Sequence, residues 1–175
     1  MLTKEALTEY SREHLWYEVW MFFTAGSFKL NVPIQSNDPE LGMFISNGML
    51  EIFVLHLRNL LDFFYAEPRK TDVTAKMFFA DSLVPSDFPV ESHSLREARR
   101  RAHKEISHLT TERLVSGDPK KGWQFAGLMR EMKVLVEAFR KKASSETLHP
   151  DFIKQVERLF ASKGLEQIVG HSRKD

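Results

Sequence analysis

The stretch that decides the fold runs from Leu41 to Ala66 and reads LGMFISNGMLEIFVLHLRNLLDFFYA. On a helical wheel its charged residues fall within a band about 40° wide, and almost every other position is apolar. A helix that is apolar over most of its circumference normally lies at the centre of its bundle. This segment is therefore predicted to be a central helix whose polar stripe faces solvent or a polar seam between helices. The stripe consists of Glu51, Arg58 and Asp62, with Asn47 and Asn59 on its margins.

Helical periodicity also dominates the rest of the chain, without a convincing alternating strand. Besides 41–66, long helices are predicted at about 3–28, 91–115 and 121–143, with a short one at 71–79 capped by Thr71 and a C-terminal one at about 150–163. Proline-containing segments at 31–42 and 81–90 are expected to be irregular. The sequence thus predicts an all-α protein, an up-down helical bundle of four long helices plus one or two short ones. We expect one domain over 1–175, with its core bundle at about 3–145 and a frayed tail at 170–175.

Composition narrows the chemistry. The 175 residues carry a net charge of +1 and no cysteine, which excludes disulfides, thiolate catalysis and cysteine-bound zinc. Neither metal-ligand spacing nor a glycine-rich phosphate loop occurs, so no metal or cofactor is expected. The N-terminus does not resemble a signal peptide and no apolar run reaches about 20 residues, so we expect a cytoplasmic protein without a membrane span. Fourteen Phe and seven Met indicate a large aromatic core or an oligomer interface.

The polar stripe allows two interpretations. Arg58 and Asp62 are four residues apart, close enough to form a structural ion pair. Alternatively, Arg58 lies in a groove and offers its guanidinium to a phosphate while Asp62 holds it in place. His56 lies off the stripe and is interpreted as a core or boundary histidine.

The predicted helix at 91–115 carries a narrow apolar stripe whose continuation reaches Arg113. A cation there needs a carboxylate such as Asp62 or Glu51, unless it reaches solvent near the helix end. His103 and His108 lie on the flanks of this helix. Beside an arginine, either could serve as a general base, or both could be ordinary boundary histidines. The stripe consists of Leu95, Ala98, Ala102, Ile106 and Leu109.

The same helix carries the strongest local positive charge. Glu97 and Glu105 interrupt the cationic run, so a solvated face with intrahelical pairs is one interpretation and a weak phosphate-backbone footprint is the other. Within it, Arg101 is a candidate binding residue. The run consists of Arg96, Arg99, Arg100, Arg101 and Lys104.

Two segments, 56–64 (HLRNLLDFF) and 102–113 (AHKEISHLTTER), resemble bacterial helical proteins of the HEPN superfamily near its abortive-infection branch. The likeness covers roughly residues 1–145, with its specific part in these segments. It implies an up-down bundle that often dimerises and, in active members, metal-independent RNA cleavage by an Arg-polar-x-x-x-His motif. Arg58 and Asn59 match the first two motif positions, but Phe63 stands where the histidine belongs.

Three functions follow as hypotheses. The first is a non-catalytic structural or interaction module, expected to be a homodimer, in which a buried network of Arg58, Asp62, His108 and Arg113 holds the helices in register. The second is a ribonuclease-type effector, a toxin or phage-defence protein, that uses Arg58 with His108 or His103. The third is a nucleotide- or phosphate-binding protein that uses Arg58, Asn59, Asp62, Arg101 and Arg113. RNA or a nucleotide is the ligand expected under the last two.

Overall fold

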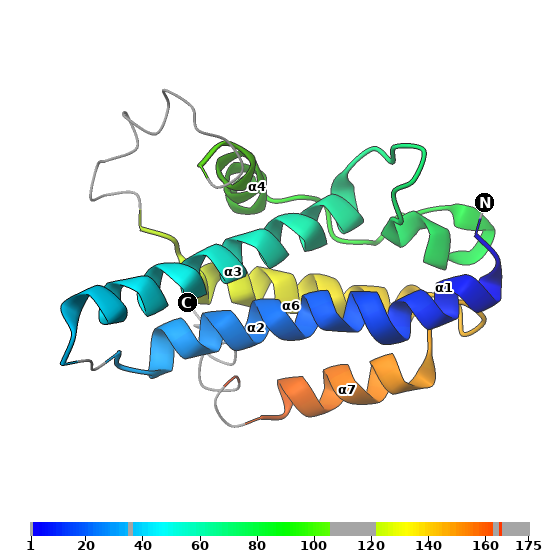
Figure 1. Cartoon of the computed structure of the whole chain (residues 1–175). Helices are drawn as coiled ribbons and strands as arrows, with labels where there is room; N and C mark the ends of the chain where they lie inside the picture. Colours follow the sequence, from blue (N-terminus) through cyan, green and yellow to red (C-terminus); the bar gives the residue numbers. More distant parts are fainter. Residues whose placement is uncertain (1, 35–36, 106–121, 163–164, 166–175) are drawn as a thin grey trace, which may run out of the picture.

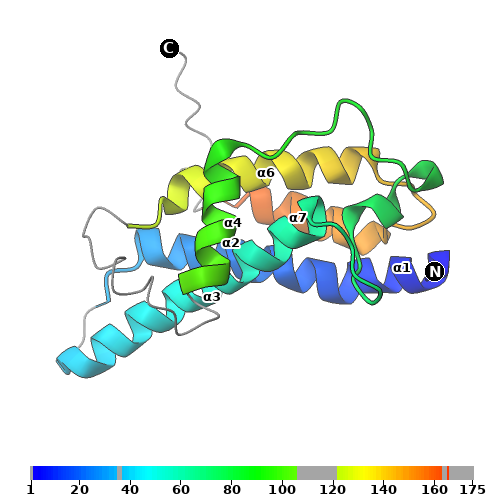
Figure 2. The same cartoon turned by 90° about the horizontal axis from the view of Figure 1, so that it is seen from above.

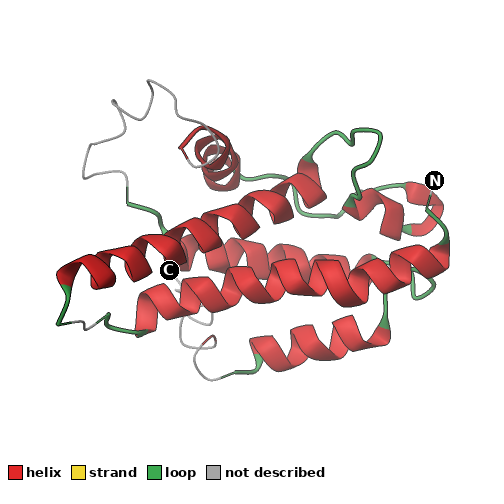
Figure 3. Ribbon diagram, viewed as in Figure 1, coloured by secondary structure: helices red, strands yellow, loops and turns green. Residues whose placement is uncertain are grey.

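The computed structural model describes residues 2–34, 37–105, 122–162 and 165. Within these ranges the fold is all-α, with five helical rods packed against one another and no strand, which confirms the predicted fold class (Figure 3). The elements are α1 (Lys4–Tyr10), a π-helical turn (Ser11–Leu15), α2 (Trp16–Asn31), α3 (Pro39–Tyr65), two 3₁₀ turns (Ala75–Phe78 and Ala80–Ser82), α4 (His93–Glu105), α6 (Phe125–Lys142) and α7 (Pro150–Phe160).

The first rod joins α1, the π turn and α2 without a break in the chain direction (Figure 1). Thr3 caps it as a side-chain acceptor, with its Oγ1 3.2 Å from the amide nitrogen of Ala6. The π turn was not predicted. Its buried Ser11 donates to the carbonyl of Thr8 at 2.7 Å and accepts from the amide of His149 at 2.9 Å. The turn therefore fixes the start of α7 against the first rod.

α3 begins two residues before the predicted start because Asp38 caps it and Pro39 occupies its first turn. The Asp38 carboxylate accepts from the amides of Glu40 at 2.9 Å and Leu41 at 3.3 Å. The helix then runs back alongside α2 as far as Tyr65, close to the predicted end.

α4 lies across α3 rather than along it (Figure 2). Ser92 starts α4 by accepting from the amide of Leu95 at 3.1 Å, and Leu95, Ala98 and Ala102 are buried, as the apolar stripe predicted. Of the predicted helix at 91–115, the part beyond Glu105 lies outside the described residues. α6 and α7 both pack against α2, with α7 on the side of α2 away from α3 (Figure 1).

One predicted element is wrong. The short helix expected from Thr71 begins only after Thr74, as a 3₁₀ turn over Ala75–Phe78. Asp72 explains the difference: its amide donates to the Arg69 carbonyl at 3.1 Å, and its carboxylate accepts from the Arg69 amide at 2.9 Å. These two bonds hold the chain in a turn, so Thr71 cannot act as a helix cap.

The core is aromatic, as the phenylalanine content indicated. Phe22 stacks on Phe53 at 4.7 Å between ring centres, Phe53 meets Phe125 at 4.6 Å, and Phe23 meets Phe160 at 5.0 Å. These contacts join α2 to α3, α3 to α6, and α2 to α7. The second half of α3 therefore lies at the centre of the bundle, as its sequence predicted.

The first half of α3 is different, because it is largely uncovered by the described residues. Phe44 is 75% exposed, Met43 59% and Leu41 49%. By length and composition α3 could cross a bilayer, and only 22% of its most apolar 18-residue stretch is buried. The length and apolar composition of α3 therefore do not mean that the whole helix is buried.

Candidate functional site

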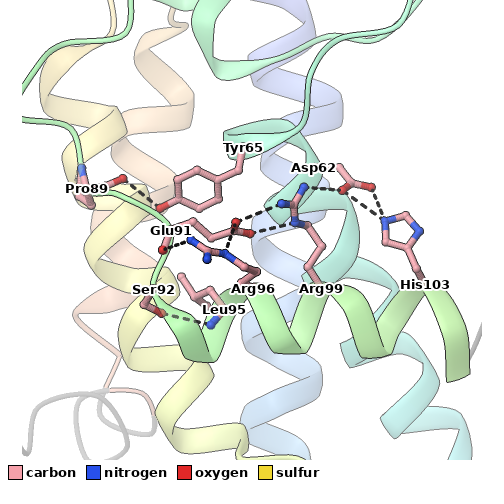
Figure 4. Close-up of polar contacts among 9 residues, drawn as sticks. All are labelled: Asp62, Tyr65, Pro89, Glu91, Ser92, Leu95, Arg96, Arg99 and His103. Atoms are coloured by element: carbon pink, nitrogen blue, oxygen red, sulfur yellow. Dashed lines mark hydrogen bonds and ion pairs between the residues drawn. The ribbon is translucent and has the colours of Figure 1, made fainter.

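One polar cluster joins α3 to α4 around Asp62 (Figure 4). The Asp62 carboxylate lies 3.3 Å from Nε2 of His103 and 3.8 Å from Nη1 of Arg99. All three side chains are partly open to solvent, with 35%, 46% and 25% exposed respectively. This part of the predicted stripe therefore faces a polar seam between two helices.

Arg99 continues the cluster to Glu91, which precedes α4. Its Nε lies 2.9 Å from Oε1 of Glu91, and its Nη2 donates to Oε2 at 3.1 Å. Arg96 approaches the same carboxylate at 3.5 Å. The Glu91 side chain is only 11% exposed, so it is the best-shielded charge of this cluster. Two arginines of the cationic run are thus held by one carboxylate.

Tyr65, at the end of α3, ties the same region to the preceding loop. Its hydroxyl donates to the carbonyl of Pro89 at 3.0 Å (Figure 4). Burial raises the pKa of Tyr65 well above its ordinary value, and the carboxylates of Glu91 and Glu131 add to the shift. The phenol is therefore held in its neutral, donating form.

A second polar cluster joins α3 to α2 around Glu18. Its Oε2 lies 2.7 Å from Nδ1 of His56 and accepts from Nδ2 of Asn59 at 3.1 Å. The ring of Tyr17 meets the His56 ring edge-on at 5.4 Å. His56 is buried, as predicted, but through a carboxylate partner that the sequence analysis did not assign.

Arg58 and Asn59 lie on α3 between the two clusters. Nη2 of Arg58 lies 3.5 Å from Oδ1 of Asn59, whose amide group also binds Glu18. The Arg58–Asp62 pair expected from their spacing is not the contact that forms. The carboxylate of Asp62 turns to α4, where Arg99 and His103 hold it.

Of the remaining candidate site residues, the structure describes Arg101 but not His108 or Arg113. The guanidinium carbon of Arg101 lies 4.3 Å from the ring centre of Trp123, a cation–π contact that links α4 to the segment before α6. His108 and Arg113 lie outside the described residues, so the predicted network that included them stays a prediction.

Sequence reasoning missed Glu18 and Glu91 as members of the site. Glu18 interrupts the apolar run Leu15–Phe23, and a carboxylate in such a run needs a buried partner. The sequence therefore indicated that Glu18 has a partner. That this partner is His56 could not be predicted from the sequence, because the pairing depends on how α2 and α3 align.

A small cavity of about 160 Å³ lies beside the Glu18 cluster. Its volume is close to that of a cavity that holds one benzene-sized ligand. Within the described part of the chain, no group of three or more His, Asp or Glu residues is arranged to hold a metal ion. The cavity is lined by Tyr10, Leu15, Glu18, Asn59, Leu60, Phe63 and Val73.

Phe63, the residue at the histidine position of the HEPN-like motif, lies in the core. Its ring meets Phe139 at 5.4 Å and Phe78 at 5.8 Å, and it is 7% exposed. Comparison of the chain with protein-family models, curated proteins and solved structures finds no match. The HEPN likeness therefore rests on the two sequence segments alone.

Proposed function

We propose that this protein is a non-catalytic interaction module, a helical scaffold that binds a protein partner through the uncovered part of α3. The observation that carries the proposal is the exposure of large apolar side chains along that helix, above all Phe44 at 75%. Contiguous apolar surface on a folded protein commonly marks an interaction site. Aromatic residues and Met are also the types enriched at protein interfaces.

The two polar clusters support a structural role for the charged stripe. Glu18 links α2 to α3 through His56 and Asn59. Asp62 links α3 to α4 through Arg99 and His103. Both carboxylates are engaged between helices, and so they fix the angle and register at which α3 is presented.

The ribonuclease hypothesis receives less support from this geometry. Position 63 faces Phe78 and Phe139 in the core, where a base could not reach a substrate. The remaining candidate base among the described residues is His103, whose Nε2 faces Asp62. Arg99, Arg100 and Arg96 are paired with Glu91 or Glu97, so much of the cationic run is neutralised locally.

A protein partner fits the face better than a lipid bilayer. Helices that lie on membranes usually carry Lys and Arg beside their apolar face, whereas the charged residues within the exposed part of α3 are Glu40 and Glu51. To span a bilayer, α3 would have to give up the Phe22–Phe53 stack and the Glu18–His56 bond. Both contacts favour α3 remaining in the bundle.

Site-specific photo-cross-linking in the producing cells tests the proposal. A benzophenone amino acid is placed at Phe44 or, as a matched control, at Val134 of α6, which is 59% exposed. We expect a discrete protein adduct from position 44 and none from position 134. Absence of an adduct at 44, or equal adducts at both positions, would contradict the proposal.

A second assay addresses catalysis directly. Mixed RNA is incubated with the protein in EDTA, alongside the variants Arg58→Ala and His103→Ala. We expect no cleavage above that of a buffer blank. RNA cleavage that is lost in both folded variants would instead establish the ribonuclease function.

A further inference from the structure

We propose that the partner is a second copy of this chain, and that the two copies pack their α3 helices antiparallel about Gly48. This inference rests on the proposed function, because it names the partner of the same face. It follows from the spacing, symmetry and size of that face.

Five residues on α3 define what we call the α3 seam, and their successive spacings are three, four, three and four. This is the heptad spacing with which one helix packs along another. The apolar members are exposed: Phe44 at 75%, Leu41 at 49% and Leu55 at 41%. The described helices therefore leave this face of α3 largely uncovered, although its spacing suits contact with another helix. The seam consists of Leu41, Phe44, Gly48, Glu51 and Leu55.

A two-fold contact pairs each residue with the position at the same distance on the other side of the middle residue, and Leu41 and Leu55 form such a pair within the seam. If Gly48 meets the partner's Gly48 antiparallel, Leu41 comes opposite Leu55 and Phe44 opposite Ile52. Glu51 comes opposite Ile45, so the two copies of Glu51 are six positions apart, about 9 Å along the axis. Leu41 and Phe44 thus face the apolar residues Leu55 and Ile52, whereas Glu51 faces Ile45 and does not meet the other copy of Glu51.

Gly48 itself points to close approach. A Cβ added at Gly48 meets no atom of the described residues within 4 Å, so packing among these residues does not require glycine there. Glycine inside a helix costs about 1 kcal/mol relative to alanine. Gly26 on α2 shows the contrast, because a Cβ there would lie 2.5 Å from Sδ of Met129. The packing inside the monomer explains Gly26, whereas a neighbouring helix outside it would explain Gly48.

The face is large enough for a specific dimer. α2 flanks the seam with Tyr17 and Trp20, which are 48% and 41% exposed, and Tyr17 lies against His56, the residue after Leu55. Two adjacent helices over about 16 residues cover about 24 by 20 Å. Counted on both copies, this footprint is about 1,000 Å², the lower bound for a specific interface.

Disulfide trapping tests the arrangement, because the chain has no cysteine of its own. Gly48→Cys places one thiol at the proposed axis, where helices about 9–10 Å apart bring facing Cα atoms to about 4.4–5.4 Å, within disulfide range. Val134→Cys is the matched exposed control on α6. Each full-length variant is mildly oxidised and analysed by non-reducing electrophoresis and intact mass, with circular dichroism to confirm the fold.

We expect rapid and nearly complete dimer formation for Gly48→Cys, at least tenfold faster than for Val134→Cys. A mixture of Leu41→Cys and Leu55→Cys chains should cross-link to each other faster than either does to itself, because the antiparallel register pairs these positions. Equal rates for positions 48 and 134 overturn the proposal, and so does faster self-linkage at 41 and 55. Cross-linking of position 44 in cells to a different protein also overturns it while leaving the proposed function intact.

Discussion

The two halves of α3 are both rich in apolar residues but have different surroundings. In the second half, Phe53, Leu57 and Leu60 are completely buried, and Phe53 packs against Phe22 of α2 and Phe125 of α6. In the first half, Leu41 and Phe44 face outward, and α3 extends away from α6 (Figure 2). Apolar composition predicted a helix that needs cover. It did not predict that the described residues would cover one half only.

The polar residues follow the same division. Glu18 of α2 reaches His56 in the covered half of α3. Asp62, in the same half, reaches Arg99 and His103 of α4. The interhelical clusters therefore anchor one half and leave the other as a projecting surface. Rigid anchoring beside an uncovered apolar face is the arrangement that a preorganised docking surface needs.

The largest expected effect contrasts two phenylalanines. Phe53→Ala removes a ring packed against Phe22 and Phe125 and should lower the free energy of unfolding by about 3–5 kcal/mol. Phe44→Ala, at an exposed position, should change it by less than about 0.5 kcal/mol in dilute protein. Urea denaturation followed by circular dichroism measures both. Similar losses for the two variants would mean that the first half is covered in the monomer.

A second contrast uses the two helical glycines. Gly26→Ala forces a methyl group against Met129 and Phe53 and should destabilise the fold by about 1–3 kcal/mol. Gly48→Ala has free space and should stabilise the dilute monomer by about 1 kcal/mol. The same denaturation experiment checks both values. A loss of stability at Gly48 would show that the monomer itself packs against it.

A third contrast compares two members of the α3–α4 cluster. Glu91 is nearly shielded from solvent and holds Arg99 and Arg96, so Glu91→Ala should cost about 1–3 kcal/mol. His103 is 46% exposed, so His103→Ala should cost less than about 0.5 kcal/mol. Hydrogen exchange should show faster exchange in α4 for the first variant. If His103→Ala loosens α4 as much, Asp62 rather than Glu91 is the principal anchor.

The smallest expected effect is a change with pH at the end of the covered half. The pKa of Tyr65 is raised in the folded state, so its contribution is complete below about pH 10, the unfolded value, and is lost as pH rises further. Wild type should therefore lose stability above about pH 10 more steeply than Tyr65→Phe. Melting temperatures measured across that range test this. If the melting temperatures of the two proteins fall equally with pH, the ionisation of Tyr65 does not contribute to the loss of stability.

Much of this fold could be predicted from helical periodicity, because caps and breakers are local signals. Thr3, Pro39 and Pro150 set helix starts at or near the expected places. The π turn could not be predicted, since it depends on the contact of Ser11 with the start of α7. The crossing of α4 over α3 could not be predicted either, because a helical pattern shows which face of a helix is buried but not the angle at which two helices cross.

The candidate site was predictable in outline only. The spacing of Arg58 and Asp62 predicted a local pair, but Arg99 and His103 of α4 compete for the same carboxylate and hold it. Glu18 gave a signal as a lone charge among apolar residues, and its partners came from another helix. Tertiary partners of this kind depend on helix alignment, which no single segment encodes.

The most direct test of the central claim is sedimentation velocity of the wild type, Phe44→Glu and Val134→Glu. We predict that the wild type sediments as a dimer, at twice the 20.4 kDa chain mass, and that Val134→Glu does the same. Phe44→Glu, which places a charge on the α3 seam, should sediment as a folded 20.4 kDa monomer. A wild type that is monomeric at every concentration, or a Phe44→Glu variant that remains dimeric, would contradict the claim that the uncovered half of α3 is where two copies meet.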